Sequence, residues 1–361
     1  MIAPLPPPVH GSAMMTQYIK NSQYISDCLS LDWVNLSTSR KLDEIGKRNL
    51  KKIYRFFSAY FKVFWKLLTR NYDACYIALT CHGNGFIKDA PFALLCKLFG
   101  KKLIIHQHNK GMSRDVDKQV FRWLFHMVYK NSTVILLSWR LYPDIEKIVS
   151  REQVRICPNG IPETEVYPRN ESQSTIPQIL FLSNLIESKG VLVLLDACKI
   201  LKEKGYLFNC RFVGGETKEI DASRFQKEVE KRGINEFVKY AGKKYGKDKY
   251  KELSDSDMFV FPTYYENETF GLVLLEAMQQ KIPVVSTTEG GIPDIVKDGD
   301  TGLLVEPKNA GDLAMKIEAL INDPDMRRSI GMNGFNNYKK NYTLDKFQEN
   351  ICQELLLVCN A

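Results

Sequence analysis

The most constraining feature of this 361-residue chain is the segment 259–307. It begins with an apolar run, Phe259–Phe261, and continues through a polar loop into a helical pattern that opens at about Phe270–Gly271. A second apolar run, Val284–Ser286, follows. A strand, a helix and a second strand in this order predict a parallel βαβ unit. Ligands bind at the carboxyl ends of the strands in such units, so the loop before the helix is the candidate site.

Two carboxylates flank the start of this predicted helix. Glu268 lies in the loop, and Glu276 lies about two turns inside the helix. The first N–H groups of the helix, around Phe270, Gly271 and Leu272, have no partners within it, and together with the helix dipole they favour an anion. Gly271 also lets a ligand approach the backbone closely. We expect a ligand with phosphates in its middle and hydroxyl groups at both ends, such as a sugar nucleotide. The alternative is an ordinary βα unit with solvated glutamates.

The spacing from Glu268 to Glu276 resembles the E-x7-E signature of retaining glycosyltransferases of family 4, which belong to glycosyl transferases group 1. The next segment, 289–307, is similar to the same family's GG-x-PE-x-V-x-DG-x-x-G motif, with Asp294 where Glu is usual. The resemblance extends more weakly over nearly the whole chain. It implies an α/β chain with the GT-B fold, in which two Rossmann-like parallel-sheet domains face each other across a cleft. It also implies a protein of the bacterial surface-polysaccharide type.

Other segments of the C-terminal half resemble the family's donor-binding motifs. Lys189 matches the lysine of the motif G-R-L-x-x-x-KG, in which Arg and Lys neutralise a nucleotide diphosphate, and Asn184 stands where the Arg is usual. An asparagine donates a hydrogen bond without charge assistance, so binding of the diphosphate should be weaker by about 1 kcal/mol or more. Gly214, in the segment 212–216, resembles part of the nucleotide-facing V-G-x-G loop. The alternative for Lys189 is a solvated surface lysine.

Two places in the N-terminal half resemble the acceptor side of the family's site. His10 and Gly11 follow a short apolar strand, although an exposed loop side chain is an equal reading for His10. His106 and His108 end the predicted strand 102–106, where ligands of a parallel sheet bind. No third metal ligand follows them nearby, so a metal site is not indicated. The resemblance favours His108, and then His106, on the acceptor side.

The resemblance also implies how these residues divide the work. Lys189 and the helix amides stabilise the departing diphosphate. Glu276 binds the ribose diol, and Glu268 binds hydroxyls of the transferred sugar. Glu268, Lys189 and His108 are therefore the catalytic candidates. No metal or other cofactor is expected, and the nucleotide-sugar donor is a co-substrate.

Residues 40–70 are basic and rich in aromatic residues, with ten Lys or Arg against two acids. Within residues 47–68, apolar and cationic residues recur at helical spacing on opposite sides. The apolar positions are Leu50, Ile53, Phe57, Tyr60, Phe64 and Leu68, and the cations are Lys51, Arg55, Lys62 and Lys66. Two readings stay open. One is a peripheral contact with an anionic membrane, and the other is a surface helix docked on the sheet with a solvated lysine face.

The length allows two domains, each with its own core. We expect an acceptor-binding domain at 1–165, a nucleotide-sugar-binding domain at 166–340, and a helix at 341–361 that packs back on the first domain. A Gly-rich turn is expected at 82–86, before a helix at 89–99. The nine cysteines form no CxxC pair, which is typical of thiols in a reducing cytosol. A cytoplasmic protein, peripheral at most at the inner face of the plasma membrane, is predicted.

The resemblance implies a retaining glycosyltransferase that acts in surface-polysaccharide biosynthesis, on a capsule or lipopolysaccharide. It would move a hexose or N-acetylhexosamine from a nucleotide-sugar, a UDP-sugar on family frequency, to a growing lipid-linked glycan. Two alternatives remain: a catalytically weak or silent nucleotide-sugar-binding protein, made conceivable by Asn184, and an epimerase-like GT-B enzyme, which should lack the E-x7-E element. The net charge of +8 permits nucleic acid as a partner, but the basic segment has no recognisable base-reading module.

Overall fold

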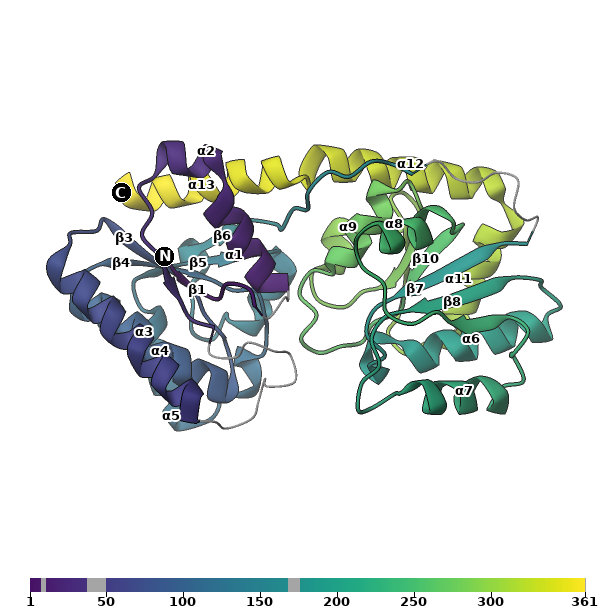
Figure 1. Ribbon diagram of the computed structural model, residues 1–361, viewed down its shortest axis with the longest axis horizontal. Helices are drawn as coiled ribbons and strands as arrows, with labels where there is room; N and C mark the ends of the chain where they lie inside the picture. The colour runs from purple at the N-terminus through teal and green to yellow at the C-terminus, as the bar shows by residue number, and fades with distance from the viewer. Residues whose placement is uncertain (8–10, 38–49, 168–175, 361) are drawn as a thin grey trace. The chain divides into compact units, whose positions relative to one another are not determined.

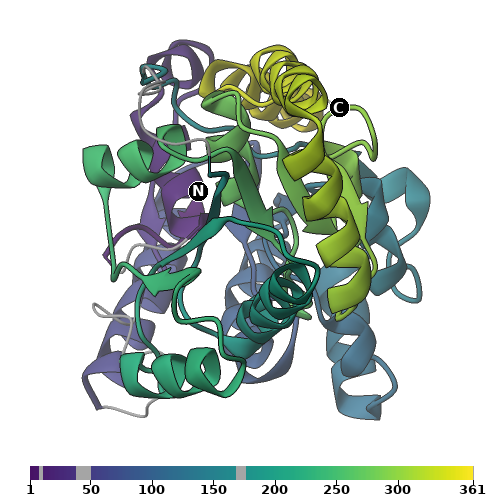
Figure 2. The same cartoon turned by 90° about the vertical axis from the view of Figure 1, so that its right-hand side faces the viewer.

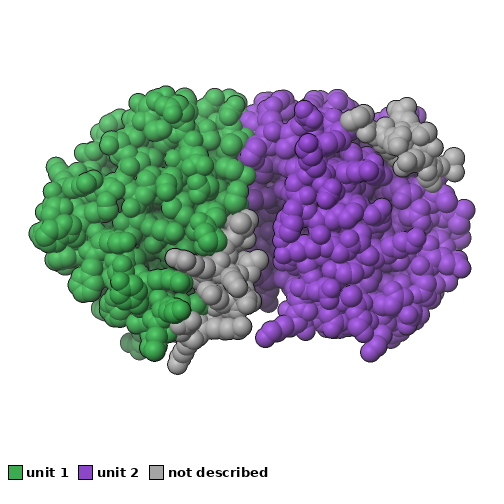
Figure 3. All heavy atoms as spheres, in the orientation of Figure 1, with its two compact units in different colours: residues 1–159, 344–361 green, residues 160–343 purple. Residues whose placement is uncertain are grey.

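The computed structural model describes residues 1–7, 11–37, 50–167 and 176–360. The chain forms two compact units, drawn in different colours in Figure 3. Unit 1 consists of Met1–Asn159 and Leu344–Ala361, and unit 2 consists of Gly160–Thr343. The predicted boundaries at 165 and 340 lie six and three residues away from these. The last segment of the chain belongs to unit 1.

Unit 1 is built on a six-stranded parallel sheet in the order β2-β1-β3-β4-β5-β6. Its strands are β1 (Ile2–Ala3), β2 (Val34–Asn35), β3 (Ala74–Ala78), β4 (Lys102–His106), β5 (Ser132–Leu136) and β6 (Val154–Ile156). The central strands β3, β4 and β5 are short apolar runs, as expected for a parallel sheet covered on both faces. Ala78, His106 and Ile135 are aligned across them, so these three strands end at nearly the same level.

Helices cover both faces of this sheet (Figure 1). One face carries α1 (Gly11–Asn21), α2 (Gln23–Cys28) and α13 (Leu344–Asn360), and the other carries α3 (Leu50–Thr69), α4 (Gly83–Leu98) and α5 (Gln119–Tyr129). Short 3₁₀ helices occur at Met112–Arg114, Trp139–Asp144 and Arg151–Gln153. On the first face Met15 and Ile19 share one core cluster with Phe347 and Ile351 of α13. The last helix of the chain therefore completes the core that the first residues begin.

The side of helix α3 that packs against its neighbours differs from the side that the apolar pattern predicts. Its buried residues are Ala59, Val63 and Leu67. Phe56 and Tyr60 pack on the ring of Phe92 in α4, with ring centroids 5.4 and 5.7 Å apart. The residues of the predicted apolar face are instead mostly exposed, namely Leu50, Ile53, Phe57, Phe64 and Leu68. A helical period locates an apolar stripe but does not say what covers it, and α3 carries apolar residues around most of its circumference. The predicted residues 47–49 lie outside the described residues.

Helix α4 begins at Gly83, six residues earlier than predicted, so the expected turn at 82–86 is its first turn. Gly83 has a left-handed φ of +57°, and its N–H donates to Asp115 Oδ2 over 2.7 Å. Burial raises the pKa of Asp115, but the hydrogen bonds from Lys118 and from the Gly83 N–H outweigh it and lower the pKa overall. A Cβ on Gly85 would lie 2.6 Å from Thr80 Cγ2, so a glycine is needed for close packing there.

Unit 2 repeats the architecture with a second six-stranded parallel sheet, in the order β12-β11-β10-β7-β8-β9. Its strands are β7 (Gln178–Leu182), β8 (Asn209–Val213), β9 (Val238–Tyr240), β10 (Met258–Phe261), β11 (Val284–Thr287) and β12 (Leu303–Val305). Its helices are α6 (Val191–Glu203), α7 (Ala222–Lys231), α8 (Gly246–Ser254), α9 (Leu272–Gln279), α10 (Ile292–Ile295), α11 (Ala310–Asn322) and α12 (Pro324–Asn341), with a 3₁₀ helix at Glu187–Lys189. Helix α6 packs beside α7 and α11, and α9 packs against α12 (Figures 1 and 2).

Candidate functional site

Four loops of unit 2 meet at one edge of its sheet. They follow β7, β8, β10 and β11 and comprise residues 183–190, 214–216, 262–271 and 288–291. These strands are neighbours in the order β11-β10-β7-β8, and all of them are parallel. Their carboxyl ends therefore bring the loops together, as in other open α/β sheets where ligands bind.

Helix α9 starts within this group of loops, at Leu272. The residue before it, Gly271, is the N-cap and has a left-handed φ of +79°, which favours glycine. Phe270 is buried, and its ring lies 6.0 Å from the ring of Tyr342, so it anchors the loop in the core. The helix begins one or two residues later than the sequence pattern predicts, because the chain still has to turn at Gly271. The leading N–H groups are those of Leu272 and Val273.

Glu268 forms an ion pair with Lys189. Lys189 Nζ lies 2.6 Å from Glu268 Oε2, and both side chains are largely buried, with 17% and 11% of their surface exposed. The ammonium group also lies 4.3 Å from the ring centroid of Tyr265 and 5.6 Å from that of Phe261. A surface lysine would have none of these partners. The structure thus places the two predicted catalytic residues of this unit in direct contact.

Glu276 forms a second ion pair, with a residue that the sequence interpretation missed. Lys249 Nζ of α8 lies 2.7 Å from Glu276 Oε1, with 23% and 15% of the two side chains exposed. The other carboxylate oxygen, Oε2, is buried and has no hydrogen-bond partner among the described residues. A buried acceptor without a partner is costly, so a hydroxyl donor from a ligand fits there.

Two glycines support the loops that carry Glu268 and Lys189. A Cβ on Gly290 would lie 2.2 Å from the carbonyl oxygen of Glu268, and a Cβ on Gly190 would lie 2.2 Å from the carbonyl oxygen of Pro262. Both glycines also have a left-handed φ. The loops after β7, β10 and β11 therefore pack backbone to backbone, which other residue types would prevent.

Asn184 serves the loop after β8. Its Oδ1 accepts a hydrogen bond of 3.2 Å from the N–H of Gly215. Gly214 has a φ of +156°, and a Cβ on it would lie 1.8 Å from the carbonyl oxygen of Ser183, so no side chain fits there. The hydroxyl of Tyr240 donates to the Gly214 carbonyl over 2.8 Å. Asn184 thus holds the glycine loop and is itself exposed at the edge of the site.

The histidines predicted on the acceptor side belong to unit 1. His106 ends β4 and is fully buried, and its Nδ1 lies 2.8 Å from the hydroxyl of Tyr76. Burial, and then the neighbouring His108, hold the pKa of His106 well below its usual range, so it stays neutral at physiological pH. The rings of His106 and His108 have centroids 4.1 Å apart. His106 thus packs beside His108, which is partly exposed, and a role for either on the acceptor side stays a prediction.

The remaining acceptor-side residues are His10 and Gly11. His10 lies outside the described residues. Gly11 is the first residue of α1 and is exposed, so it belongs to a helix start and not to a free loop. The helix N-terminus, the two carboxylates and the two lysines form one group within unit 2. The histidines form another group within unit 1.

Chemically, the group in unit 2 can hold an anion between two hydroxyl-binding carboxylates. The start of α9 offers N–H donors, and Lys189 supplies a fixed positive charge beside Glu268. Within the described ranges no group of three or more His, Cys, Asp or Glu is arranged to hold a metal ion. The N–H donors and the lysine charge suit a phosphate-containing ligand.

Comparison with known proteins agrees with this geometry. Residues 163–337 match the model of the family described as glycosyl transferases group 1. The chain is 32% identical over 174 residues to WcaL of Escherichia coli, named as a glycosyltransferase of colanic acid biosynthesis, which covers 47% of this chain and 42% of WcaL. It is 33% identical over 156 residues to the capsular polysaccharide biosynthesis glycosyltransferase CapM of Staphylococcus aureus, and this match covers 43% of this chain and 39% of CapM. The chain thus spans less than half the length of these curated relatives.

A solved structure extends the likeness to both units. The crystal structure of HepE from Anabaena in complex with UDP has a TM-score of 0.71 to this protein at 20% identity, and the match covers 83% of this chain and 82% of HepE. At this identity the match shows the fold. The predicted α/β class with two parallel sheets is confirmed. Residues 163–337 thus match the family described as glycosyl transferases group 1, within a chain that has the GT-B fold.

Proposed function

We propose that this protein is a retaining glycosyltransferase that moves a sugar from a UDP-sugar to a growing, lipid-linked glycan of a surface polysaccharide. The observation that carries the proposal is the pair of lysine-bound glutamates on either side of the α9 N-terminus. Glu268, paired with Lys189, lies before the helix, and Glu276, paired with Lys249 of α8, lies inside it. This arrangement matches a ligand with a diphosphate between two hydroxyl-rich groups.

Each part of the donor then has a partner in unit 2. The diphosphate lies at the N–H groups that open α9, beside the ammonium group of Lys189. The ribose diol donates to Glu276, whose buried Oε2 has no hydrogen-bond partner among the residues described. The hydroxyls of the transferred sugar donate to Glu268. Gly214 and Gly215 let the nucleotide approach the backbone after β8 closely.

The relatives support the choice of donor and product. HepE was crystallised with UDP, and WcaL and CapM are named for colanic acid and capsular polysaccharide biosynthesis. The proposal places the acceptor on a lipid at the inner face of the plasma membrane, with this protein peripheral to it. His108 is the acceptor-side residue, held in place by the buried ring of His106.

In the reaction the bond between the anomeric carbon and the diphosphate oxygen breaks, and a bond to the acceptor oxygen forms on the same face of the sugar. The proton of the acceptor hydroxyl passes to the departing phosphate. Lys189 and the α9 N–H groups stabilise the negative charge that develops on the diphosphate, which in such sites supplies a large part of the rate enhancement. No metal is assigned to this step.

Calorimetry with UDP and GDP, each with and without EDTA, tests the donor site. We expect UDP to bind and EDTA to leave the affinity unchanged. Binding of GDP alone would overturn the choice of nucleotide, and loss of binding in EDTA would overturn the metal-free site.

A product assay with UDP-sugars and a membrane lipid extract tests the transfer. UDP binding without any transfer or donor hydrolysis would favour a silent nucleotide-sugar-binding protein. A donor converted into an epimer, without transfer, would favour the epimerase alternative.

A further inference from the structure

The outer surface of α3, α4 and α5 carries most of the exposed apolar surface of this protein. Of the 21 large hydrophobic residues that are exposed among the described residues, 13 lie on these three helices. Eight are on α3: Leu50, Ile53, Tyr54, Phe57, Phe61, Phe64, Trp65 and Leu68. The others are Ile87 and Leu98 on α4, and Val120, Trp123 and Met127 on α5. We call these 13 residues the aromatic face. Isolated exposed apolar residues need no explanation, but a gathering of this size marks an interaction site.

The aromatic face is part of one layer. Phe56 and Tyr60 of α3 pack on Phe92 of α4, and Phe86 of α4 packs on Phe125 of α5 with ring centroids 4.3 Å apart. The inward sides of the three helices are thus occupied by unit 1 itself. The outward sides carry the aromatic face, and all of it belongs to unit 1.

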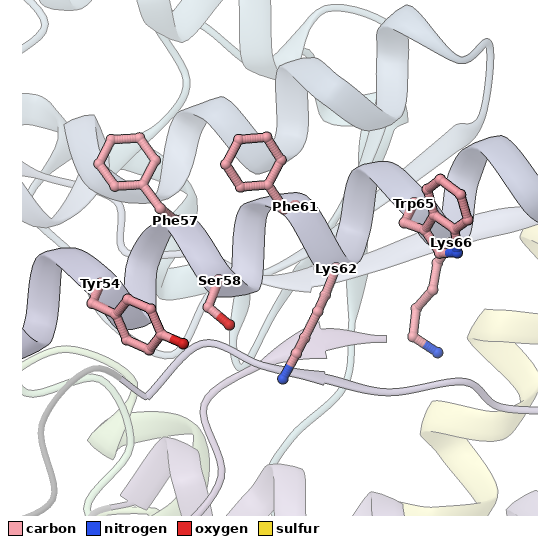
Figure 4. Close-up of a pocket in the computed structure, with 7 residues that line it drawn as sticks. All are labelled: Tyr54, Phe57, Ser58, Phe61, Lys62, Trp65 and Lys66. Atoms are coloured by element: carbon pink, nitrogen blue, oxygen red, sulfur yellow. The ribbon is translucent and has the colours of Figure 1, made fainter.

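Helix α3 shows the character of the face in detail (Figure 4). The rings of Phe57 and Phe61, one helical turn apart, point to the same side of the helix, and Lys62 and Lys66 extend from another side. With Tyr54 and Trp65 they line a shallow groove of about 560 Å³. Phe61 and Trp65 are each 64% exposed, and Tyr54 is 75% exposed. An aromatic stripe bordered by lysines along one helix is the pattern of a helix that lies in the plane of a bilayer surface.

The charge of the same helix is wholly positive. Residues 50–70 contain six Lys or Arg and no Asp or Glu, and α5 contains Arg122 and no acid. Lys66 is held by Asp32 over 2.5 Å, which fixes this end of α3 to the loop before β2. The aromatic face is therefore bordered by basic residues on a helix that is fixed in place. It attracts anionic headgroups and repels a second copy of itself.

We infer that the aromatic face binds unit 1 to an anionic phospholipid bilayer, with the aromatic rings at the headgroup level and the flanking lysines on the phosphates. Among the described residues no helix is long and apolar enough to cross a membrane, so the contact is one of a helix lying on the surface. A second copy is disfavoured because a symmetric pair would oppose like charges. The inference names the surface behind the peripheral placement in the proposed function and rests on it in that respect, but it does not depend on the transfer reaction.

Cosedimentation with phospholipid vesicles tests the inference. The full chain is mixed with vesicles of phosphatidylcholine, with or without phosphatidylglycerol. The test variant is Phe57→Ser with Phe61→Ser and Trp65→Ser. The matched control is Leu207→Ser with Met315→Ser and Met332→Ser, which removes three exposed apolar side chains of unit 2. Circular dichroism confirms folding of both variants.

We expect the wild type and the control to bind anionic vesicles, and added salt to weaken this binding. The test variant should bind about tenfold more weakly or worse. Equal binding to neutral vesicles would overturn the role of anionic lipid. Unchanged binding of the test variant would overturn the aromatic face as the contact.

A third result would also reject the inference. If neither vesicle binds and the wild type forms a dimer in analytical ultracentrifugation that the test variant does not form, the face joins two copies of this chain. UDP binding is measured on the same samples. If the wild type does not bind UDP, this result counts against the proposed function alone, because vesicle binding needs no donor.

Discussion

Lys249 and Glu276 stand on successive helices, α8 and α9, and their side chains meet over 2.7 Å. The lysine binds only one oxygen of the carboxylate. The other oxygen is buried and has no hydrogen-bond partner in the described part of the chain. The ion pair therefore fixes the carboxylate with one acceptor unused, which a ribose hydroxyl would satisfy.

Replacing Glu276 should weaken the binding of UDP. Glu276→Ala removes the proposed acceptor of the ribose diol, and we expect a loss of about 1.5–3 kcal/mol in binding free energy, as for a charge-assisted hydrogen bond. Calorimetry measures it. Glu318→Ala, which removes an ion-paired glutamate of α11, is the matched control. Equal UDP affinity in wild type and Glu276→Ala would contradict the assignment of Glu276 to the ribose.

The Lys249–Glu276 pair should also be coupled in stability. Lys249→Met leaves a largely buried carboxylate without its cation, and we expect the free energy of unfolding to fall by about 1–3 kcal/mol. Adding Glu276→Gln should recover part of this loss, because no uncompensated charge then remains. Urea denaturation of the two single variants and the double variant gives the coupling energy. Strictly additive effects would show that the two side chains do not interact in solution.

Asn184→Arg should strengthen nucleotide binding. The variant loses the hydrogen bond to the Gly215 N–H but brings a cation to the loop proposed to face the diphosphate. A charge-assisted hydrogen bond is worth about 1 kcal/mol more than a neutral one, so UDP should bind about fivefold to tenfold more tightly. Asn184→Lys is a useful comparison, because it adds the charge without the planar fork of arginine. Weaker binding of both variants would mean that the loop contact of Asn184 matters more than charge.

Gly290 should be far less tolerant of substitution than Gly299. Both have a left-handed φ, +55° and +77°. A Cβ on Gly290 would lie 2.2 Å from the Glu268 carbonyl oxygen, whereas nothing lies within 4 Å of one on Gly299. Gly299→Ala should therefore cost only the backbone strain of about 1 kcal/mol. Gly290→Ala should cost about 3 kcal/mol or more and displace Glu268. Thermal melting compares the two, and similar melting temperatures would contradict the backbone contact.

Asp32 should make unit 1 sensitive to acid. Burial raises its pKa, but the hydrogen bonds from Lys66 and Tyr72 outweigh this and lower the pKa to about 2. Because the pKa is lower in the folded protein than in the unfolded chain, the ionised carboxylate stabilises the fold above about pH 4, and this contribution is lost as the pH falls towards about 2. Asp32→Asn should lower the free energy of unfolding by about 1–2 kcal/mol at pH 7, after allowance for partial exposure.

The matching measurement for Asp32 is urea denaturation of wild type and Asp32→Asn across this pH range. The difference between them should shrink on acidification. A difference that stayed constant from neutral to acidic pH would assign the effect to packing instead of charge.

The site in unit 2 was largely accessible from the sequence because it is local in the chain. Glu268, the helix start and Glu276 fall within nine residues, so their spacing alone predicts a shared helix and loop. Lys189 could be added only through its motif resemblance, since it lies 79 residues from Glu268. Lys249 had no such signal. It is one of several lysines in a polar segment, and only its ion pair with Glu276 in the structure selects it.

Unit 1 shows where pattern alone is insufficient. The period of α3 is clear, but the same period arises whether an apolar stripe faces a core or a membrane. Ala59 and Val63, which are smaller than the aromatic residues around them, decide the outcome by facing inward. His106 was predicted on the acceptor side because it ends a strand, yet the hydroxyl of Tyr76 on β3 satisfies its Nδ1 inside the core. The end of a strand shows where a residue lies along the sheet, but it does not show how deeply the side chain is buried.

The passage of α13 into unit 1 has a consequence for how the protein is made. Synthesis runs from the N-terminus, so unit 2 is complete once residue 343 has been added, whereas the core of unit 1 still lacks Phe347, Ile351 and Leu355. Unit 1 is thus completed only after unit 2. Until α13 emerges from the ribosome, Met15, Ile19 and Ile25 lack its side chains as partners. This apolar surface is therefore open to chaperones while unit 2 is being translated.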